Sequence, residues 1–279
     1  MQKAATSTLN ESEQRQAASR AAPRAVVVHE IVREEGETEL KRTAAALAWS
    51  GFAAGLSMGF SFVALALLRG GLPDAPWRPL LASFGYSMGF VIVILGRQQL
   101  FTESTLTAVL PVLTRRDGRT LLAMLRLWAI VLCANLVGTV LFAVLVSRDG
   151  IFRPEVFQAF IEIGRESVGG DFWPVLVKAV FAGWLIALMV WLLPAAGSAR
   201  LFVIILLTYL VALGGLSHVI AGAVEAAFAV LSGHASLREY LLGFFAPTLL
   251  GNIIGGVSLV ALLNHAPVSS ELEGETAGG

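Results

Sequence analysis

The chain has 279 residues, of which 56% are hydrophobic and only 14% are charged, and its mean hydropathy is +0.74. Because a typical globular chain has about 25% charged residues, this composition excludes an ordinary soluble domain and predicts a protein that crosses a membrane several times. The formal net charge is zero, which argues against a nucleic-acid partner. A single cysteine excludes an internal disulfide.

The two ends of the chain are polar. Residues 1–22 and residues 266–279 lack apolar periodicity, so both segments are predicted to be disordered tails. Residues 23–45 place apolar side chains among charges at roughly helical spacing, which predicts an amphipathic helix on the cytoplasmic membrane surface. His29 lies in this helix and is interpreted as a solvated residue. Residues 46–265 form the predicted transmembrane domain.

Six apolar runs follow one another along this domain. A transmembrane helix needs about 20 apolar residues, and four uninterrupted runs have that length: Ala46–Leu68, Leu127–Val146, Val175–Leu193 and Leu241–Leu263. Two further runs are long enough but interrupted, Leu80–Leu113 by GRQQLFTEST and Leu201–Val230 by GGLSH. The sequence therefore predicts six spans, of which the second and the fifth are broken.

Basic residues indicate the orientation of these spans. The loop TRRDGR holds Arg115, Arg116 and Arg119, and Lys41 and Arg42 precede the first span. Because cytoplasmic loops carry an excess of Lys and Arg, both termini are predicted to be cytoplasmic. Three arginines between the third and fourth spans weaken this signal: Arg148, Arg153 and Arg165.

The two halves of the domain share an order of elements. The third span contains ANLVG, with Asn135, and the sixth contains GNIIG, with Asn252; each motif follows a broken span at nearly the same distance. An odd number of spans in each half inverts the second half relative to the first, as in many channels and transporters. The predicted fold is therefore an all-α membrane protein of six transmembrane helices in two inverted three-helix repeats.

The helix breaks are the first candidates for a functional site. Non-helical backbone at membrane depth is tolerated where it is buried in protein or lines a watery cavity, so the two breaks suggest a shared central path. Gly214 and Gly215 loosen the chain just before His218. Asn135 and Asn252 would hydrogen-bond the freed backbone of the breaks, the alternative being ordinary bonding between helices.

Several polar residues near the breaks have two interpretations each. His218 is either a satisfied histidine between packed helices or a pore-facing proton carrier. Arg97 either pairs with Glu103 or the loop backbone, or attracts an anion at the pore mouth. Glu225 would face a vestibule or a neighbouring protomer, and Lys178 is expected to extend toward the membrane surface.

Three motifs agree in order with one known family. LFTES (100–104), SHVIAG (217–222) and FAPTLLGNIIGG (245–256) resemble the formate/nitrite transporter family, and the likeness runs from about Pro23 to Ala266. The sequence looks most similar to an inner-membrane branch of that family. The resemblance implies an aquaporin-like fold with one pore per protomer, and a homopentamer.

The resemblance also implies roles for individual residues. Leu100, Phe101 and Thr102 match the family's L-F-T loop, and His218 matches its central histidine. The apolar constrictions on either side of that histidine would be formed by the residues at the corresponding positions, Phe90 and Val211.

The chain departs from the family pattern at several positions, including Arg97 and Gln98, which stand where small residues are common. Transporting members usually have a Glu before the histidine and an Asn four residues after it, where this chain has Ser217 and Gly222. Gln99 stands in place of an acidic residue before L-F-T. A family lysine near the entrance to the fourth span lacks a clear counterpart, because Lys178 is expected to lie too far along the helix.

The leading hypothesis is a pore for a small monovalent anion, such as formate or nitrite, and its conjugate acid. The anion would pass Phe90 or Val211 and meet Thr102 and His218, which would donate a proton. Alternatives are a channel for water or a small neutral solute, and a non-transporting membrane scaffold. The sequence lacks the motifs of common enzyme classes and a cluster of metal-ligand residues, so neither an enzyme nor a cofactor is predicted.

Overall fold

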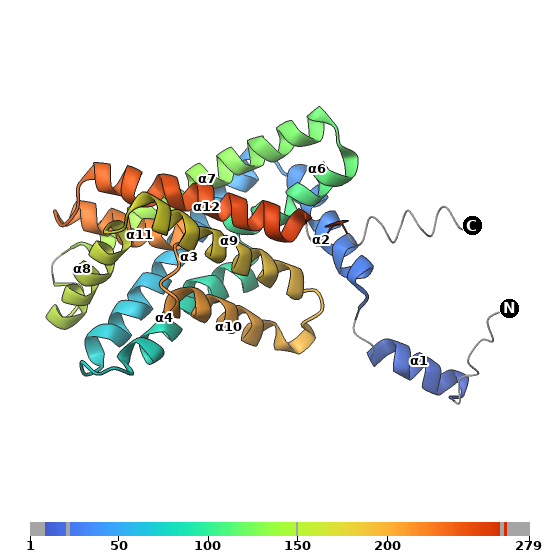
Figure 1. Cartoon of the computed structure of the whole chain (residues 1–279), viewed down its shortest axis with the longest axis horizontal. Coiled ribbons are helices and arrows are strands. Elements are labelled where there is room, and N and C mark those ends of the chain that lie inside the picture. Colours follow the sequence, from blue (N-terminus) through green and yellow to red (C-terminus); the bar gives the residue numbers. More distant parts are fainter. Residues whose placement is uncertain (1–8, 21–22, 149, 263–264, 267–279) are drawn as a thin grey trace.

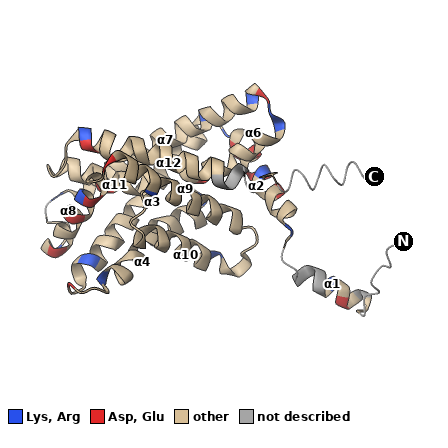
Figure 2. Cartoon of the chain, viewed as in Figure 1, with Lys and Arg blue, Asp and Glu red and all other residues tan. Residues whose placement is uncertain are grey.

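The computed structural model describes residues 9–20, 23–148, 150–262 and 265–266, and every regular element among them is helical (Figure 1). Five segments are long and apolar enough to cross a membrane: α3 (Ala44–Gly71), α4 (Arg78–Leu95), α7 (Gly118–Val146), α9 (Phe172–Leu192) and the final segment Glu239–Ser258. Charged residues lie toward the two ends of the bundle and are sparse between them (Figure 2). The chain is therefore a multi-pass, all-helical membrane protein.

Two shorter pairs of helices complete the bundle. After α4 the chain is non-helical until α5 (Phe101–Thr107), which α6 (Val109–Arg115) follows; after η1 (Gly197–Ala199), α10 (Arg200–Leu213) is separated from α11 (Val219–Leu231) in the same way. Each gap contains one residue in the left-handed region, Arg97 with φ 53° and Gly215 with φ 56°. The helices stop at both places where the apolar runs are interrupted in sequence.

Glycines bring pairs of spans into close contact. A Cβ atom on Gly55 of α3 would lie 2.2 Å from the carbonyl oxygen of Asn135 on α7. A Cβ atom on Gly183 of α9 would lie 2.4 Å from the carbonyl oxygen of Asn252 on α12 (Ala246–Ile254). Small residues permit such contacts between helix backbones, and here they occur at corresponding places in the two halves of the chain.

The final span is not a regular α-helix throughout. The π-helical segments η2 (Glu239–Phe245) and η3 (Gly255–Leu262) flank α12. A wider helical turn changes which side chains face the neighbouring helices. In this span the π-helical segment η2 contains Phe244, which is 2% exposed and packs against Gly222 of α11.

Additional helices cover the two ends of the bundle, here called the α2 end and the α8 end (Figure 1). α2 (Ala25–Leu40) packs beside α5 and α6, where Gly36 faces the carbonyl group of Thr107. At the other end, the apolar face of α8 (Pro154–Val168) is buried, and the ring of Phe160 lies 4.6 Å from that of Phe62 on α3. The two helices therefore dock through apolar and close backbone contacts.

Two features of the N-terminal region differ from the sequence-based expectation. Within the predicted disordered tail, α1 (Glu11–Arg20) is helical, because Asn10 and Glu13 form reciprocal hydrogen bonds that cap its first turn. This helix stands apart from the bundle (Figure 1). His29 is 5% exposed rather than solvated, because α2 packs it against Trp191 and His265. Residues 1–8 and 267–279 of the predicted tails lie outside the described residues.

Candidate functional site

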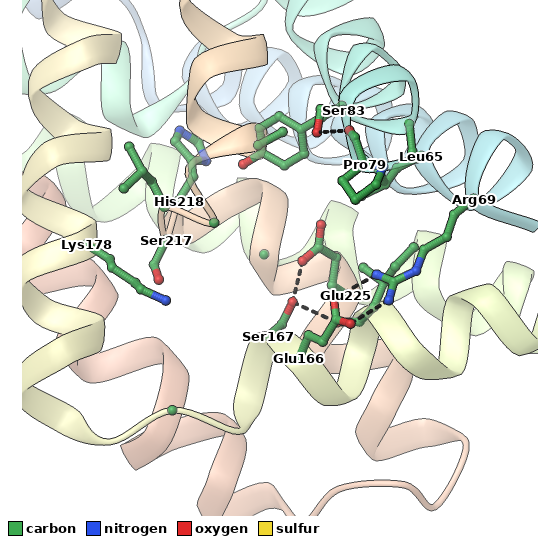
Figure 3. A pocket seen from close by; sticks show the side chains of 18 of the residues that line it. Leu65, Arg69, Pro79, Ser83, Glu166, Ser167, Lys178, Ser217, His218 and Glu225 are labelled. Atoms are coloured by element: carbon green, nitrogen blue, oxygen red, sulfur yellow. Dashed lines mark hydrogen bonds and ion pairs between the residues drawn. The ribbon is translucent and has the colours of Figure 1, made fainter. Parts of the chain in front are cut away.

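A pocket of about 400 Å³ opens at the α8 end and extends inward to His218 (Figure 3). Its walls come from α3, α4, α8, α9, α10, α11 and η2 and from the gap between α10 and α11. Three cationic side chains, Arg69, Arg78 and Lys178, and two carboxylates, Glu166 and Glu225, line it. The pocket is therefore a polar cavity within an otherwise apolar bundle.

At the floor of the pocket, a residue from one helix break contacts a residue that closely follows the other break. Ser217 and His218 belong to the gap between α10 and α11 and line the pocket, and His218 is only 1% exposed. The Nε2 atom of His218 lies 2.8 Å from the Oγ1 atom of Thr102, in the first turn of α5. Two residues that are 116 positions apart in sequence are thus directly hydrogen-bonded.

The hydrogen bonds of His218 assign its tautomer. The Nδ1 atom accepts a hydrogen bond from the backbone N–H of Ala221 at 3.1 Å, so that His218 caps α11. In the neutral ring the proton must then lie on Nε2, which donates to Thr102. The Thr102 hydroxyl is left with its own hydrogen to donate, because among the described residues no second partner engages it.

Phe90 and Val211, the residues expected to form apolar constrictions, are both buried. Phe90 is fully buried, and its ring meets that of His218 edge-on with the ring centroids 5.0 Å apart. Val211 is also fully buried, and its carbonyl group accepts a hydrogen bond from Leu216 at 2.9 Å. Neither Phe90 nor Val211 lines the open pocket.

The L-F-T loop supports the floor from the side of α5. Leu100 and Phe101 are 0% and 1% exposed, respectively. The Phe101 ring packs edge-on against Trp128 of α7, with 5.7 Å between their centroids. Among the three loop side chains, Thr102 is hydrogen-bonded to His218, while Phe101 packs against a span.

Asn135 and Asn252 make matching sets of hydrogen bonds. Asn135 Oδ1 accepts from the N–H of Phe101 at 2.9 Å, and its Nδ2 donates to the carbonyl groups of Gly51 and Gln99 at 2.7 and 3.0 Å.

Asn252 repeats this pattern at the other break. Its Oδ1 accepts from the N–H of Val219 at 2.8 Å, and its Nδ2 donates to the carbonyl groups of Ala179 and Ser217 at 2.8 and 2.9 Å. In each half, one asparagine amide accepts a hydrogen bond from the first N–H of a half-helix and donates to two carbonyl groups. One carbonyl group belongs to the residue two positions before that N–H, and the other belongs to a neighbouring span. Gly214 and Gly215, in the same gap, continue the turn that presents Ser217 and His218.

The structure corrects the expected pairing of Arg97. Its guanidinium lies 2.6 Å from Glu35 of α2, with the Arg97 side chain 70% exposed, and it does not line the pocket. Gln99 is buried and accepts a hydrogen bond from Arg42 at 2.8 Å. This break is thus linked to the N-terminal segment. Arg97 and Glu35 are 62 residues apart in the sequence, so no local pattern indicated their contact.

Lys178, which was expected to extend toward the membrane surface, lines the pocket together with His218. Its side chain extends into the pocket near Ser217 (Figure 3). A position along a helix does not show which neighbouring elements enclose the side chain.

The pocket also contains residues that the sequence did not single out. Arg69 binds both carboxylate oxygens of Glu166 at 2.7 and 2.5 Å, which ties α3 to α8. Ser167 donates a hydrogen bond to Glu225 of α11. Arg69 and Glu166 are 97 residues apart in sequence, so no local pattern signals this contact.

Comparison with known proteins accounts for this arrangement. The formate/nitrite transporter family model matches residues 26–266. The chain belongs to the formate/nitrite transporter family. This is a family of transporters rather than of enzymes, and no group of three or more metal-ligating side chains occurs among the residues that could be described.

Relatives of the chain include membrane proteins and channels. It is 43% identical over 249 residues to the inner membrane protein YfdC of Escherichia coli, covering 89% of this chain and 80% of that protein. It is 23% identical to the formate channel BtFdhC of Bacillus thuringiensis over 86% of this chain and 93% of that protein.

Solved structures of the formate/nitrite transporter family share the fold. A pentameric formate channel with formate bound superimposes with a TM-score of 0.67 at 22% identity, covering 79% of this chain and 95% of that one. An FNT family ion channel superimposes with a TM-score of 0.70 at 21% identity, covering 85% and 94% of the two chains.

Proposed function

We propose that this protein is a pore for a small monovalent anion, such as formate or nitrite, or for its conjugate acid. The observation that carries the proposal is the hydrogen bond between His218 and Thr102, at the floor of a polar pocket and between two helix breaks. Membership of the formate/nitrite transporter family and relatives named as formate channels support the choice of solute.

The proposed architecture is an aquaporin-like fold of six spans in two inverted three-helix repeats. The fifth span would consist of α10 and α11, and the second of α4, α5 and α6. Support comes from the matching hydrogen bonds of Asn135 and Asn252 and the matching contacts of Gly55 and Gly183. Two symmetry-related breaks would then meet on one central path.

The pocket at the α8 end would act as the outer vestibule. Arg69 and Arg78 are already paired with carboxylates, whereas Lys178 has no ion pair among the described residues. Lys178 and the positive end of the α11 dipole would therefore attract an anion toward Ser217 and His218. The buried carboxyl group of Glu225 also lines this vestibule and, when ionised, would repel anions and limit their accumulation there.

At the floor, we assign His218 the role of a hydrogen-bond donor rather than of a proton donor. With Nδ1 engaged by Ala221, the ring holds one proton on Nε2, and releasing it would leave an imidazolate anion. The Thr102 hydroxyl, oriented by His218, would donate to the solute. Because a bare anion is costly to desolvate between Phe90 and Val211, protonation from the vestibule water would favour passage as the neutral acid.

The proposed setting is the bacterial inner membrane, with both termini and the α2 end cytoplasmic and the protein assembled as a homopentamer. The inner-membrane relative supports the location, and the structural neighbour named as a pentamer supports the assembly. The basic residues of the α2 end support the orientation: Lys41, Arg42, Arg115, Arg116 and Arg119.

The test is uptake of formate and nitrite into liposomes that contain the purified protein, measured at pH 5.5 and pH 7.5. We expect faster uptake at the lower pH, an at least tenfold loss in His218→Ala, and substantial retention in His218→Gln, whose amide can still donate to Thr102. Equal loss in both variants would instead indicate proton transfer by the imidazole.

Two other outcomes would overturn the proposal. Osmotic swelling without anion uptake would identify a channel for water or a neutral solute. A protein that is folded and correctly inserted but passes no solute would identify a membrane scaffold.

A further inference from the structure

A second pocket, of about 190 Å³, lies at the α2 end between α2, α6 and the beginning of α7. It is separate from the pocket that reaches His218, with which it shares no lining residue. Three basic side chains, Lys41, Arg115 and Arg119, line it together with one acidic side chain, Glu37. Basic residues near α6 are visible as blue segments at this end of the molecule (Figure 2).

The single carboxylate of this basic pocket is already neutralised. Glu37 pairs with Arg115 at 2.8 Å and with Arg33 on its own helix, and Lys41 lies 4.0 Å from it. Arg119 is exposed and has no ion pair in the part of the chain that is described. The basic pocket therefore has an excess of positive charge and a free guanidinium, which suits binding of a phosphate group in a bidentate manner.

An exposed apolar surface begins directly beside the basic pocket. Leu121, Leu122 and Leu125 of α7 are 42%, 68% and 47% exposed. Leu122 follows Arg119 by three positions, so the two side chains are neighbours on the helix surface. Because α7 is long and apolar enough to cross the membrane, this surface can contact acyl chains where the basic pocket meets the membrane surface.

We propose that the basic pocket binds the phosphate headgroup of an anionic phospholipid, such as phosphatidylglycerol or cardiolipin. Arg119 and Lys41 bind the phosphate, while the acyl chains lie along the three leucines of α7. Basic pockets at the ends of transmembrane helices are suited to such headgroups. The lipid binds between α2 and α7 and thereby holds the amphipathic helix against the bundle. This site does not depend on what the pore transports.

The test is native mass spectrometry of the full-length protein in a neutral detergent, with phosphatidylglycerol, phosphatidylcholine or inorganic phosphate added. We expect phosphatidylglycerol to stay bound and phosphatidylcholine to dissociate. Because each basic residue near the surface contributes about 1 kcal/mol to lipid binding, the affinity should fall about fivefold in Arg119→Gln and about 25-fold in the double variant with Lys41→Gln.

The matched control is Arg153→Gln. Arg153 is an exposed arginine beyond the opposite end of α7, so its loss should leave lipid binding unchanged. Equal retention of phosphatidylcholine, or unchanged binding in the double variant, would overturn the proposal. So would competition by millimolar inorganic phosphate that fully displaces the lipid, since the site would then be one for free phosphate.

Discussion

At the scale of single residues, the molecule uses two asparagines to make helix breaks possible inside a membrane. A backbone N–H without a partner costs more in hydrocarbon than in water. Asn135 and Asn252 each satisfy one such N–H and two carbonyl groups, and both are fully buried. Their role is therefore to stabilise the backbone that presents Thr102 and His218.

This role predicts similar losses of stability for Asn135→Ala and Asn252→Ala. Each substitution removes three hydrogen bonds worth about 1 kcal/mol each and leaves a buried N–H unpaired, so we expect each to lower the free energy of unfolding by about 3 kcal/mol. Unfolding in detergent, followed by circular dichroism, measures the effect. Ser147→Ala, which removes one hydrogen bond to Val144, is the control and should lower it by less than about 1 kcal/mol.

Gly222 leads to a second prediction at this scale. A Cβ atom here would lie 2.6 Å from the ring of Phe244, so Gly222→Ala should lower the free energy of unfolding by about 1–3 kcal/mol. Replacing Phe244 by Leu in the same protein should recover part of this loss, which a double-mutant cycle of thermal unfolding measures. Additive effects of the two substitutions would show that the ring does not limit the space at Gly222.

At the scale of elements, α2 is fastened to the bundle by polar contacts on both of its sides. His29 Nε2 lies 2.9 Å from His265 Nδ1 near the end of the chain, and Glu35 pairs with Arg97 beside a helix break. Thr107 of α5 donates a hydrogen bond to Glu39 at 2.6 Å. α2 therefore contacts the helix break before α5, α5 itself and His265.

The histidine pair predicts weaker docking of α2 in acid. Burial lowers the pKa of His29, and His265 lowers it further. The folded state then binds fewer protons than the unfolded state, so stability is lost as the pH falls below the unfolded pKa of about 6.5. The protection of the α2 amides, measured as their exchange rate relative to the intrinsic rate at the same pH, should therefore be weaker at pH 5.5 than at pH 7.5.

The control for this prediction separates titration of the pair from general acid effects. His29→Gln removes the titrating group and should reduce the pH dependence of amide protection in α2. His234→Gln alters a histidine that bonds Ser232 at the end of α11 and should leave it unchanged. A pH dependence that persists in His29→Gln would assign the effect to other groups.

At the scale of the whole molecule, charged residues gather toward the two ends of the bundle and are sparse between them (Figure 2). We expect a pentamer, with a mass five times that of the 29.6 kDa chain, in native mass spectrometry from a mild detergent. Cross-linking in native membranes provides an independent measurement. A dominant monomer or dimer in both measurements would contradict this expectation.

Much of the arrangement could be predicted from sequence because it depends on local composition. Apolar runs of sufficient length become spans, since lipid requires satisfied backbone and apolar side chains. α4 and α10 end where the two interruptions, GRQQLFTEST and GGLSH, begin. The repeated N-x-x-G motif therefore indicated the two asparagines, and the helix break indicated His218.

Contacts between distant segments had to come from the folded structure, because no local pattern encodes them. The sequence placed His218 and Thr102 at two breaks, but the tautomer of His218 depends on a hydrogen bond from Ala221 that exists only once α11 has formed. Arg97 pairs with Glu35, and Lys178 lines the pocket, because helix packing sets which side chains meet. Apolar periodicity determines which segments enter the membrane, whereas packing of the spans determines the chemistry that they enclose.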